Sequence, residues 1–216
     1  MKITRKGWAL FVGVSLLAPV LAYALLSWYN QKAGALPYYG PGYTIQDHPP
    51  FYEVPGFTFL NQDSLVTTGE FVQDRVWVGH YFFTTCPSIC PKMMNSLAGV
   101  DEAFRGNTLV RFVSFTVDPD HDTPSALKAY ALSKGIDGHR WQLLTGAKKD
   151  LYRYARNALS IVATDGDGGP GDFIHSEKLV LIDHHRHIRG YYDGTESSDV
   201  SQLIHDIHRL IDEKSH

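Results

Sequence analysis

An uncharged run of 22 residues near the N-terminus divides the chain. It extends from Trp8 to Tyr29 and reads WALFVGVSLLAPVLAYALLSWY. As a helix it would be about 33 Å long, which is close to the thickness of the hydrocarbon core of a bilayer. Aromatic residues stand at both of its ends, as they do at membrane interfaces, and Pro19 is tolerable in a membrane helix. Residues 8–29 are therefore predicted to form a transmembrane anchor.

The residues before this run indicate its orientation. Residues 1–7 contain Lys2, Arg5 and Lys6, and a basic end of this kind stays in the cytoplasm. The alternative is a signal peptide cleaved near Ala22–Ala24. We favour an uncleaved anchor because the apolar run continues past that point. No Arg-rich and Ser-rich transit segment precedes it, so we expect a single-pass protein of a bacterial inner membrane whose C-terminal domain lies in the periplasm.

Charge is distributed unevenly along the sequence. Every charged residue up to Gly34 is basic, and the remainder of the chain has 16 basic and 23 acidic residues. The exported part therefore carries net negative charge, and we do not expect a nucleic-acid partner.

The remaining sequence predicts a linker and one folded domain. Residues 30–50 are rich in Pro, Gly and Tyr and lack apolar periodicity, as is typical of a linker. Residues 51–216 alternate between strand and helix patterns and end with a hairpin and a helix. This order predicts an α/β thioredoxin-like fold, with a central mixed sheet flanked by helices. The predicted strands are 56–63, 75–83, 108–118 and 140–146, the helices 93–104, 123–135, 148–159 and 197–211, and the hairpin 178–192.

The only two cysteines lie in the segment TTCPSICPKMM, between a predicted central strand and a helix. In an exported protein their default interpretation is a structural disulfide, and the alternatives are a redox pair or part of a metal site. Pro91 disfavours helical dihedrals at Cys90, so we expect the helix to begin at Pro91. Cys90 would then be the cap and Cys86 would lie in the preceding loop. The positive end of the helix dipole would lower both thiol pKa values.

Two thiolates alone do not complete most metal sites, so a third ligand is expected. His175 follows a Gly- and Asp-rich loop and precedes a predicted strand, and in a thioredoxin-like fold this junction faces the active-site helix. A Cys2His set suits Cu(I), and the imidazole also suits Cu(II), whereas a closed zinc site normally has four protein ligands. The other histidine groups are expected to be solvated: His184, His185 and His187 at a turn, and His205 and His208 on the last helix.

Four segments together resemble the Sco/SenC family over roughly Phe51 to Leu210. They are FTTCPSICPKMM, FVSFTVDPDHDTPSALKAY, WQLLTG and DFIHSEKLVLID. The combination of CPxxCP, VDPxxDTP and a histidine before a strand is far more specific than a CxxxC motif alone. The family consists of membrane-anchored, thioredoxin-fold copper proteins that help assemble the CuA centre of cytochrome c oxidase. The histidine-rich turn at residues 184–187 departs from the Gly-containing turn common in the family.

The resemblance implies a set of site residues and partners. Cys86, Cys90 and His175 correspond to the copper ligands, and Asp118 corresponds to an acidic residue near the site. The implied function is a metallochaperone rather than an enzyme, carrying Cu(I) or Cu(II) to the copper-site subunit of cytochrome c oxidase. A periplasmic copper donor and a thioredoxin-like reductant are further implied partners. The alternative is a membrane-anchored thiol-disulfide oxidoreductase that reduces the cysteines of the copper acceptor.

Overall fold

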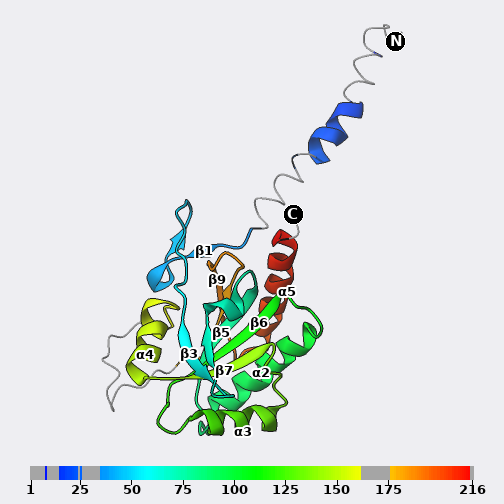
Figure 1. Cartoon of the computed structure of the whole chain (residues 1–216). Coiled ribbons are helices and arrows are strands. Elements are labelled where there is room, and N and C mark those ends of the chain that lie inside the picture. Colours follow the sequence, from blue (N-terminus) through cyan, green and yellow to red (C-terminus); the bar gives the residue numbers. More distant parts are fainter. Residues whose placement is uncertain (1–7, 9–14, 24, 26–34, 162–175, 215–216) are drawn as a thin grey trace. The chain divides into compact units, whose positions relative to one another are not determined.

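The structure, a computed structural model, describes residues 8, 15–23, 25, 35–161 and 176–214 (Figure 1). The chain forms two units, Met1–Leu36 and Pro37–His216. The elements of the second unit are β1 (Tyr38–Tyr39), η1 (Pro41–Tyr43), β2 (Ile45–Gln46), β3 (Thr58–Asn61), β4 (Val66–Thr68), η2 (Gly69–Val72), β5 (Val76–Phe82), α2 (Ile89–Ala103), β6 (Val110–Thr116), α3 (Pro124–Lys134), β7 (Trp141–Thr145), α4 (Lys148–Asn157), β8 (Lys178–Ile182), β9 (Ile188–Asp193) and α5 (Ser197–Lys214).

The first unit contains the predicted anchor. Residues 15–23 of it are helical. Among the described residues, no helix is both long enough and apolar enough to cross a membrane. Residues 9–14, 24 and 26–29 of the predicted anchor lie outside the described part, so the anchor stays a prediction.

The second unit is built on one mixed sheet with the strand order β2-β1-β9-β8-β5-β6-β7-β3-β4. The three central strands β5, β6 and β7 are parallel, and every other pairing is antiparallel. All seven residues of β5 are buried, as expected for a strand covered on both faces. The predicted mixed sheet is confirmed, and so are the alternation of its main strands with helices along the chain and the C-terminal hairpin and helix.

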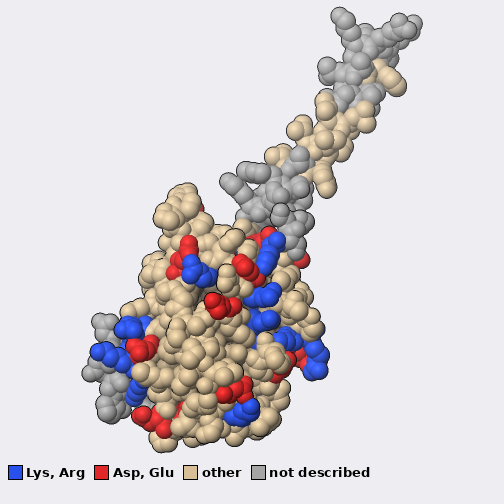
Figure 2. Space-filling view, in the orientation of Figure 1, with Lys and Arg blue, Asp and Glu red and all other residues tan. Residues whose placement is uncertain are grey.

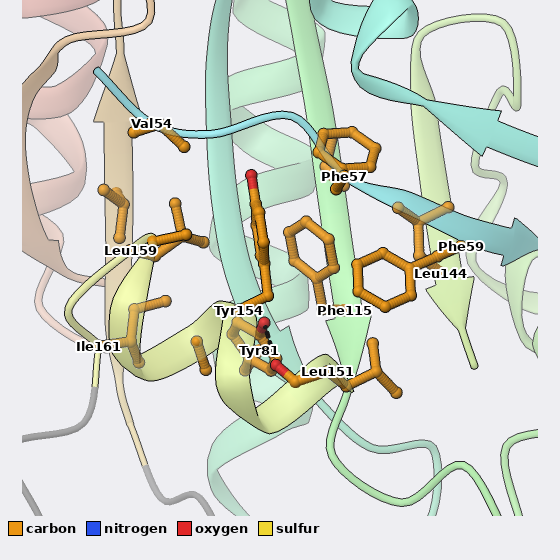
Figure 3. Packing of buried hydrophobic residues seen from close by; sticks show 14 of the residues in the cluster. Val54, Phe57, Phe59, Tyr81, Phe115, Leu144, Leu151, Tyr154, Leu159 and Ile161 are labelled. Carbon is orange, nitrogen blue, oxygen red and sulfur yellow. Dashed lines mark hydrogen bonds between the residues drawn. The ribbon is translucent and has the colours of Figure 1, made fainter. Parts of the chain in front are cut away.

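Helices cover both faces of this sheet (Figure 1). Helix α4 lies on one face, where its tyrosines and Leu151 pack with aromatic residues of the sheet and of the segment before β3 (Figure 3). The Phe115 ring lies 5.6 Å from Phe57 and 5.3 Å from Tyr154, and the Tyr81 hydroxyl donates to the Leu151 carbonyl at 2.8 Å. Helices α2, α3 and α5 lie on the other face. Each aromatic pair of this geometry contributes about 1 kcal/mol beyond the area that it buries.

Residues 37–50 are folded, although the sequence predicts a linker over 30–50. Strand β1 pairs with β2 in a hairpin and with β9 through Tyr39 and Ile188. The Tyr38 ring stacks on Phe51 with centroids 3.8 Å apart, and the Arg189 guanidinium lies 4.1 Å from the centre of the same ring. The tyrosines that gave this segment its linker-like composition therefore attach it to the sheet.

Local sequence signals at the helices are largely confirmed. Thr123 caps α3 by accepting the Ala126 N–H at 3.3 Å, and α3 ends at Gly135 in the left-handed conformation (φ 67°). Met93 and Met94 of α2 are buried in the core. On the face shown in Figure 2, acidic and basic side chains are intermixed.

A buried polar contact joins the three parallel strands. His80 on β5 is fully buried, and its Nε2 lies 2.6 Å from Oγ of Ser114 on β6. The Trp141 indole N–H on β7 donates to the same Oγ at 2.7 Å, so the Ser114 hydroxyl contacts polar side chains of both neighbouring strands. Burial lowers the pKa of His80 from 6.5 to about 4. The folded protein therefore holds a neutral imidazole in its centre.

This burial makes the fold sensitive to acid. The folded-state pKa of His80 is below the unfolded-state value, so its contribution to stability is complete above about pH 6.5 and is lost as the pH falls toward 4. The unfolding free energy of the parent should fall between pH 7 and pH 5. We expect this fall to be about 2 kcal/mol smaller in His80→Gln. Urea unfolding at both pH values measures this. His48→Gln, at an exposed histidine, should keep the parent's pH dependence; the same dependence in His80→Gln would contradict the assignment.

Candidate metal centre

The two cysteines lie where β5 leads into α2. Cys86 is half-buried and Cys90 is 7% exposed, and both thiols are free. The Cys86 N–H donates to the Phe83 carbonyl at 3.3 Å, and the Cys90 N–H donates to Cys86 Sγ at 3.4 Å. The two residues are thus held together by a direct contact between the backbone of one and the sulfur of the other.

Helix α2 begins two residues earlier than the sequence predicts. It starts at Ile89 with Ser88 as the N-cap, so Cys90 is its second residue and Pro91 its third. The first four N–H groups of a helix have no partner within the helix, so Pro91 removes no helical hydrogen bond there. The Ser88 side chain makes no capping hydrogen bond. Cys86 Sγ, which accepts the Cys90 N–H, therefore satisfies one of the free donors at the start of α2.

The two thiols differ in acidity. Burial alone would raise the pKa of Cys86, but hydrogen bonds from the backbone N–H groups of Cys90, Ser88 and Ile89 outweigh it and lower that pKa. Burial is the main cause that raises the pKa of Cys90 to about 12. The predicted lowering of the thiol pKa is therefore found for Cys86 but not for Cys90, because that prediction took account of the helix dipole but not of burial.

A cavity of about 530 Å³ opens beside the cysteines. Tyr43, from the N-terminal hairpin, forms part of its wall, and its hydroxyl donates to the Ile161 carbonyl at 3.4 Å. The described residues on either side of the Gly- and Asp-rich loop, Ile161 and Ser176, both line this cavity. His175, the predicted third ligand, lies outside the described residues, directly before Ser176.

The acidic residues after β6 are arranged differently from the sequence prediction. The Asp118 carboxylate lies 2.8 Å from Nδ1 of His121, and Asp118 does not line the cysteine cavity. The pair raises the pKa of His121, mainly through the hydrogen bond. Asp122 is fully buried and accepts hydrogen bonds from Thr84 and Thr116. Asp118 therefore lies outside the lining of the cavity beside the cysteines.

The histidine-rich turn belongs to a different part of the molecule. His184, His185 and His187 border a cavity of about 570 Å³ beside Trp77, near the start of β5, whereas the cysteines follow its end. His185 is exposed as expected, but His184 and His187 are half-buried. Within the described ranges, no group of three or more His, Cys, Asp or Glu side chains is arranged to hold a metal ion.

Comparisons with known proteins point to one family. The family model described as SCO1/SenC matches residues 46–212. The SCO1 protein homolog of Bacillus subtilis (strain 168) is 29% identical over 168 residues, which cover 77% of this chain and 86% of the relative. A putative copper-binding protein of Stutzerimonas stutzeri is 27% identical, covering 70% of this chain and 74% of the relative. The solved structure of BsSco has a TM-score of 0.64 and 28% identity, covering 76% of this chain and 96% of that one. BsSco is described as a member of the Sco family of cytochrome c oxidase assembly proteins with a disulfide switch.

The difference in thiol acidity predicts selective modification. Because the thiolate is the nucleophile, iodoacetamide at pH 7 should alkylate Cys86 of the reduced protein at least about tenfold faster than Cys90. Peptide mass spectrometry after timed quenching measures both rates. In a Cys86→Ser variant, Cys90 should remain slow until the protein is unfolded. Equal rates at the two cysteines of the parent would contradict the assignment.

Proposed function

Because the chain belongs to the SCO1/SenC family, we propose that it binds copper as a cargo and helps assemble the CuA centre of cytochrome c oxidase. In this proposal Cys86, Cys90 and His175 are the copper ligands. The similarity to the putative copper-binding protein of Stutzerimonas stutzeri supports copper as the cargo. The similarity to BsSco, a member of a family of cytochrome c oxidase assembly proteins, supports the oxidase as the acceptor.

The observation that carries the proposal is the cavity beside the two free thiols. Cys86, Cys90 and Ser176 all line it. His175 is the residue directly before Ser176 in the sequence. Two sulfur donors and one imidazole form a set suited to Cu(I).

The acidity of the thiols determines what copper binding requires. A thiol must lose its proton to act as a metal ligand, and metal affinity therefore depends on pH. Cys86 has a lowered pKa and Cys90 a raised one. Copper loading accordingly releases the Cys90 proton to solvent, and the positive charge of the metal replaces it beside the sulfur.

A thiol-disulfide exchange function is the second candidate, and the asymmetry of the same pair favours it. In such a step the Cys86 thiolate attacks a disulfide of the copper acceptor, a mixed disulfide forms, and one acceptor sulfur leaves as a thiol. Cys90 then loses its proton and attacks Cys86, which frees the second acceptor thiol. Two electrons pass to the acceptor, and Cys86 and Cys90 end as a disulfide that an external dithiol of the thioredoxin-like class must reduce.

The location and partners complete the proposal. We assign the anchor to residues 8–29 in a bacterial inner membrane and the domain to the periplasm, on the basis of the uncharged run and the basic residues before it. The proposed partners are the copper-site subunit of the oxidase, a copper donor and a dithiol reductant. Retention of the chain in the membrane fraction after an alkaline carbonate wash tests the anchor.

Removing the imidazole should separate copper binding from disulfide formation. We expect His175→Ala in reduced residues 35–216 to weaken Cu(I) binding at least about tenfold, because one of three ligands is lost. The Cys86–Cys90 disulfide should still form. Competition with a chromogenic Cu(I) chelator measures affinity. His205→Ala, at an exposed histidine of α5, is the control and should bind as the parent does. Parent-like affinity in His175→Ala would exclude it as a ligand.

The same variant distinguishes the two functions in a cell. If copper transfer is the function, cells carrying His175→Ala should contain little assembled oxidase at low copper, as measured by the CuA absorption and oxygen uptake of isolated membranes. Thiol exchange does not require the imidazole, so full assembly at low copper would favour the exchange function instead.

A further inference from the structure

A buried carboxylate lies beneath the cysteine segment. Asp122 is 0% exposed and comes from the loop between β6 and α3. Two other buried aspartates, Asp183 and Asp206, lie 3.0 and 3.1 Å from the guanidinium groups of Arg189 and Arg209. The hydrogen-bond donors found for Asp122 are neutral and belong to Thr84 and Thr116. A buried charge is costly unless it is well paired, so this arrangement calls for an explanation.

These donors connect Asp122 to the cysteine segment. Thr84 stands two residues before Cys86, and its backbone N–H lies 3.3 and 3.2 Å from the two carboxylate oxygens of Asp122. The Thr84 hydroxyl donates to Oδ1 of the same carboxylate. The Asp122 side chain therefore binds both the backbone and the side chain of Thr84, two residues after the end of β5.

Asp122 is itself fixed by the neighbouring strand. Its Oδ2 accepts the hydroxyl proton of Thr116, the last residue of β6, at 2.5 Å. The Asp122 N–H donates to the Asp118 carbonyl at 2.8 Å, and the Asp118 N–H donates to Oγ1 of Thr116 at 2.9 Å. The carboxylate thus joins the ends of two paired central strands, and the cysteine segment begins at this junction.

We propose that Asp122 is a positioning residue for the redox pair: by holding Thr84, between the end of β5 and Cys86, it fixes the segment that brings Cys86 and Cys90 together. A dithiol whose sulfurs are held close has a high effective concentration of one thiol at the other, which favours the disulfide. Loosening the segment lowers that concentration and shifts the equilibrium toward the dithiol. This inference rests on one part of the proposed function, namely that Cys86 and Cys90 form a reversible disulfide.

The test measures the reduction potential of the full chain in detergent, without copper. The protein is equilibrated with reduced and oxidised dithiothreitol; one molecule of dithiothreitol reduces one Cys86–Cys90 disulfide and becomes its own cyclic disulfide. The dithiol fraction is read by alkylation and mass spectrometry. We expect Asp122→Asn to shift the equilibrium about tenfold toward the dithiol, which for two electrons is about 30 mV less negative.

A second variant tests whether the effect passes through Thr84. Thr84→Val removes the hydroxyl donor but keeps the backbone N–H, so we expect a shift in the same direction of about threefold, roughly 15 mV. It also keeps the proposal testable if Asp122→Asn does not fold. A shift in Asp122→Asn with no shift in Thr84→Val would mean that the charge acts by itself, and it would overturn positioning. Parent potentials in both variants would overturn it as well.

The matched control is Asp183→Asn, another buried carboxylate, which lies in the turn between β8 and β9. It should lower the melting temperature and leave the potential unchanged. An equal shift in this control would show that general destabilisation, not positioning, moves the potential. Since copper is absent, failure of the proposed copper function would appear only in the chelator competition, and failure of this inference only in the potential.

Discussion

The parallel pairing of β5 with β6 is the constraint on which the site depends. The two strands pair over seven residues, from Val76 with Val110 to Phe82 with Thr116, so they end together. Parallel strands require crossover connections, and here α2 provides one. The chain leaving β5 must therefore turn into α2 at the same edge where β6 delivers Thr116 and Asp122. The cysteine segment is the connection between β5 and α2, so this strand pairing fixes its position.

Most of the fold could be predicted from the sequence, because the central strands are continuous apolar runs and α3 has a clear cap and end. The start of α2 is harder to predict. A proline favours the first helical position but is equally compatible with the third, which Pro91 occupies, and sequence alone does not distinguish these positions. The raised thiol pKa of Cys90 escapes prediction for another reason. It depends on burial by parts of the chain distant in sequence, whereas the helix dipole is a local property.

Two other features depended on long-range contacts. Residues 37–50 lack periodicity, and their order comes from pairing with β9 and from stacking of Tyr38 on Phe51, about a dozen residues further along the chain. Asp122 lies next to Thr123, so a helix cap was the natural interpretation of its position. Its true partners include Thr84, 38 residues earlier, and no local signal relates the two. The VDPxxDTP segment nevertheless indicated that this loop lies near the site.

The two cysteines serve different purposes although they share one site. Cys86 accepts N–H donors at the start of α2, which stabilise negative charge on an accessible sulfur. Cys90 is enclosed by the core, where a thiolate without a counter-charge is unfavourable. A free dithiol therefore keeps one proton at Cys90. In the proposed function, either closing the disulfide or binding copper would remove that proton. The two outcomes would compete, because both use the thiolate sulfurs, and the burial of Cys90 would make either one more favourable than an ionised thiol without a partner.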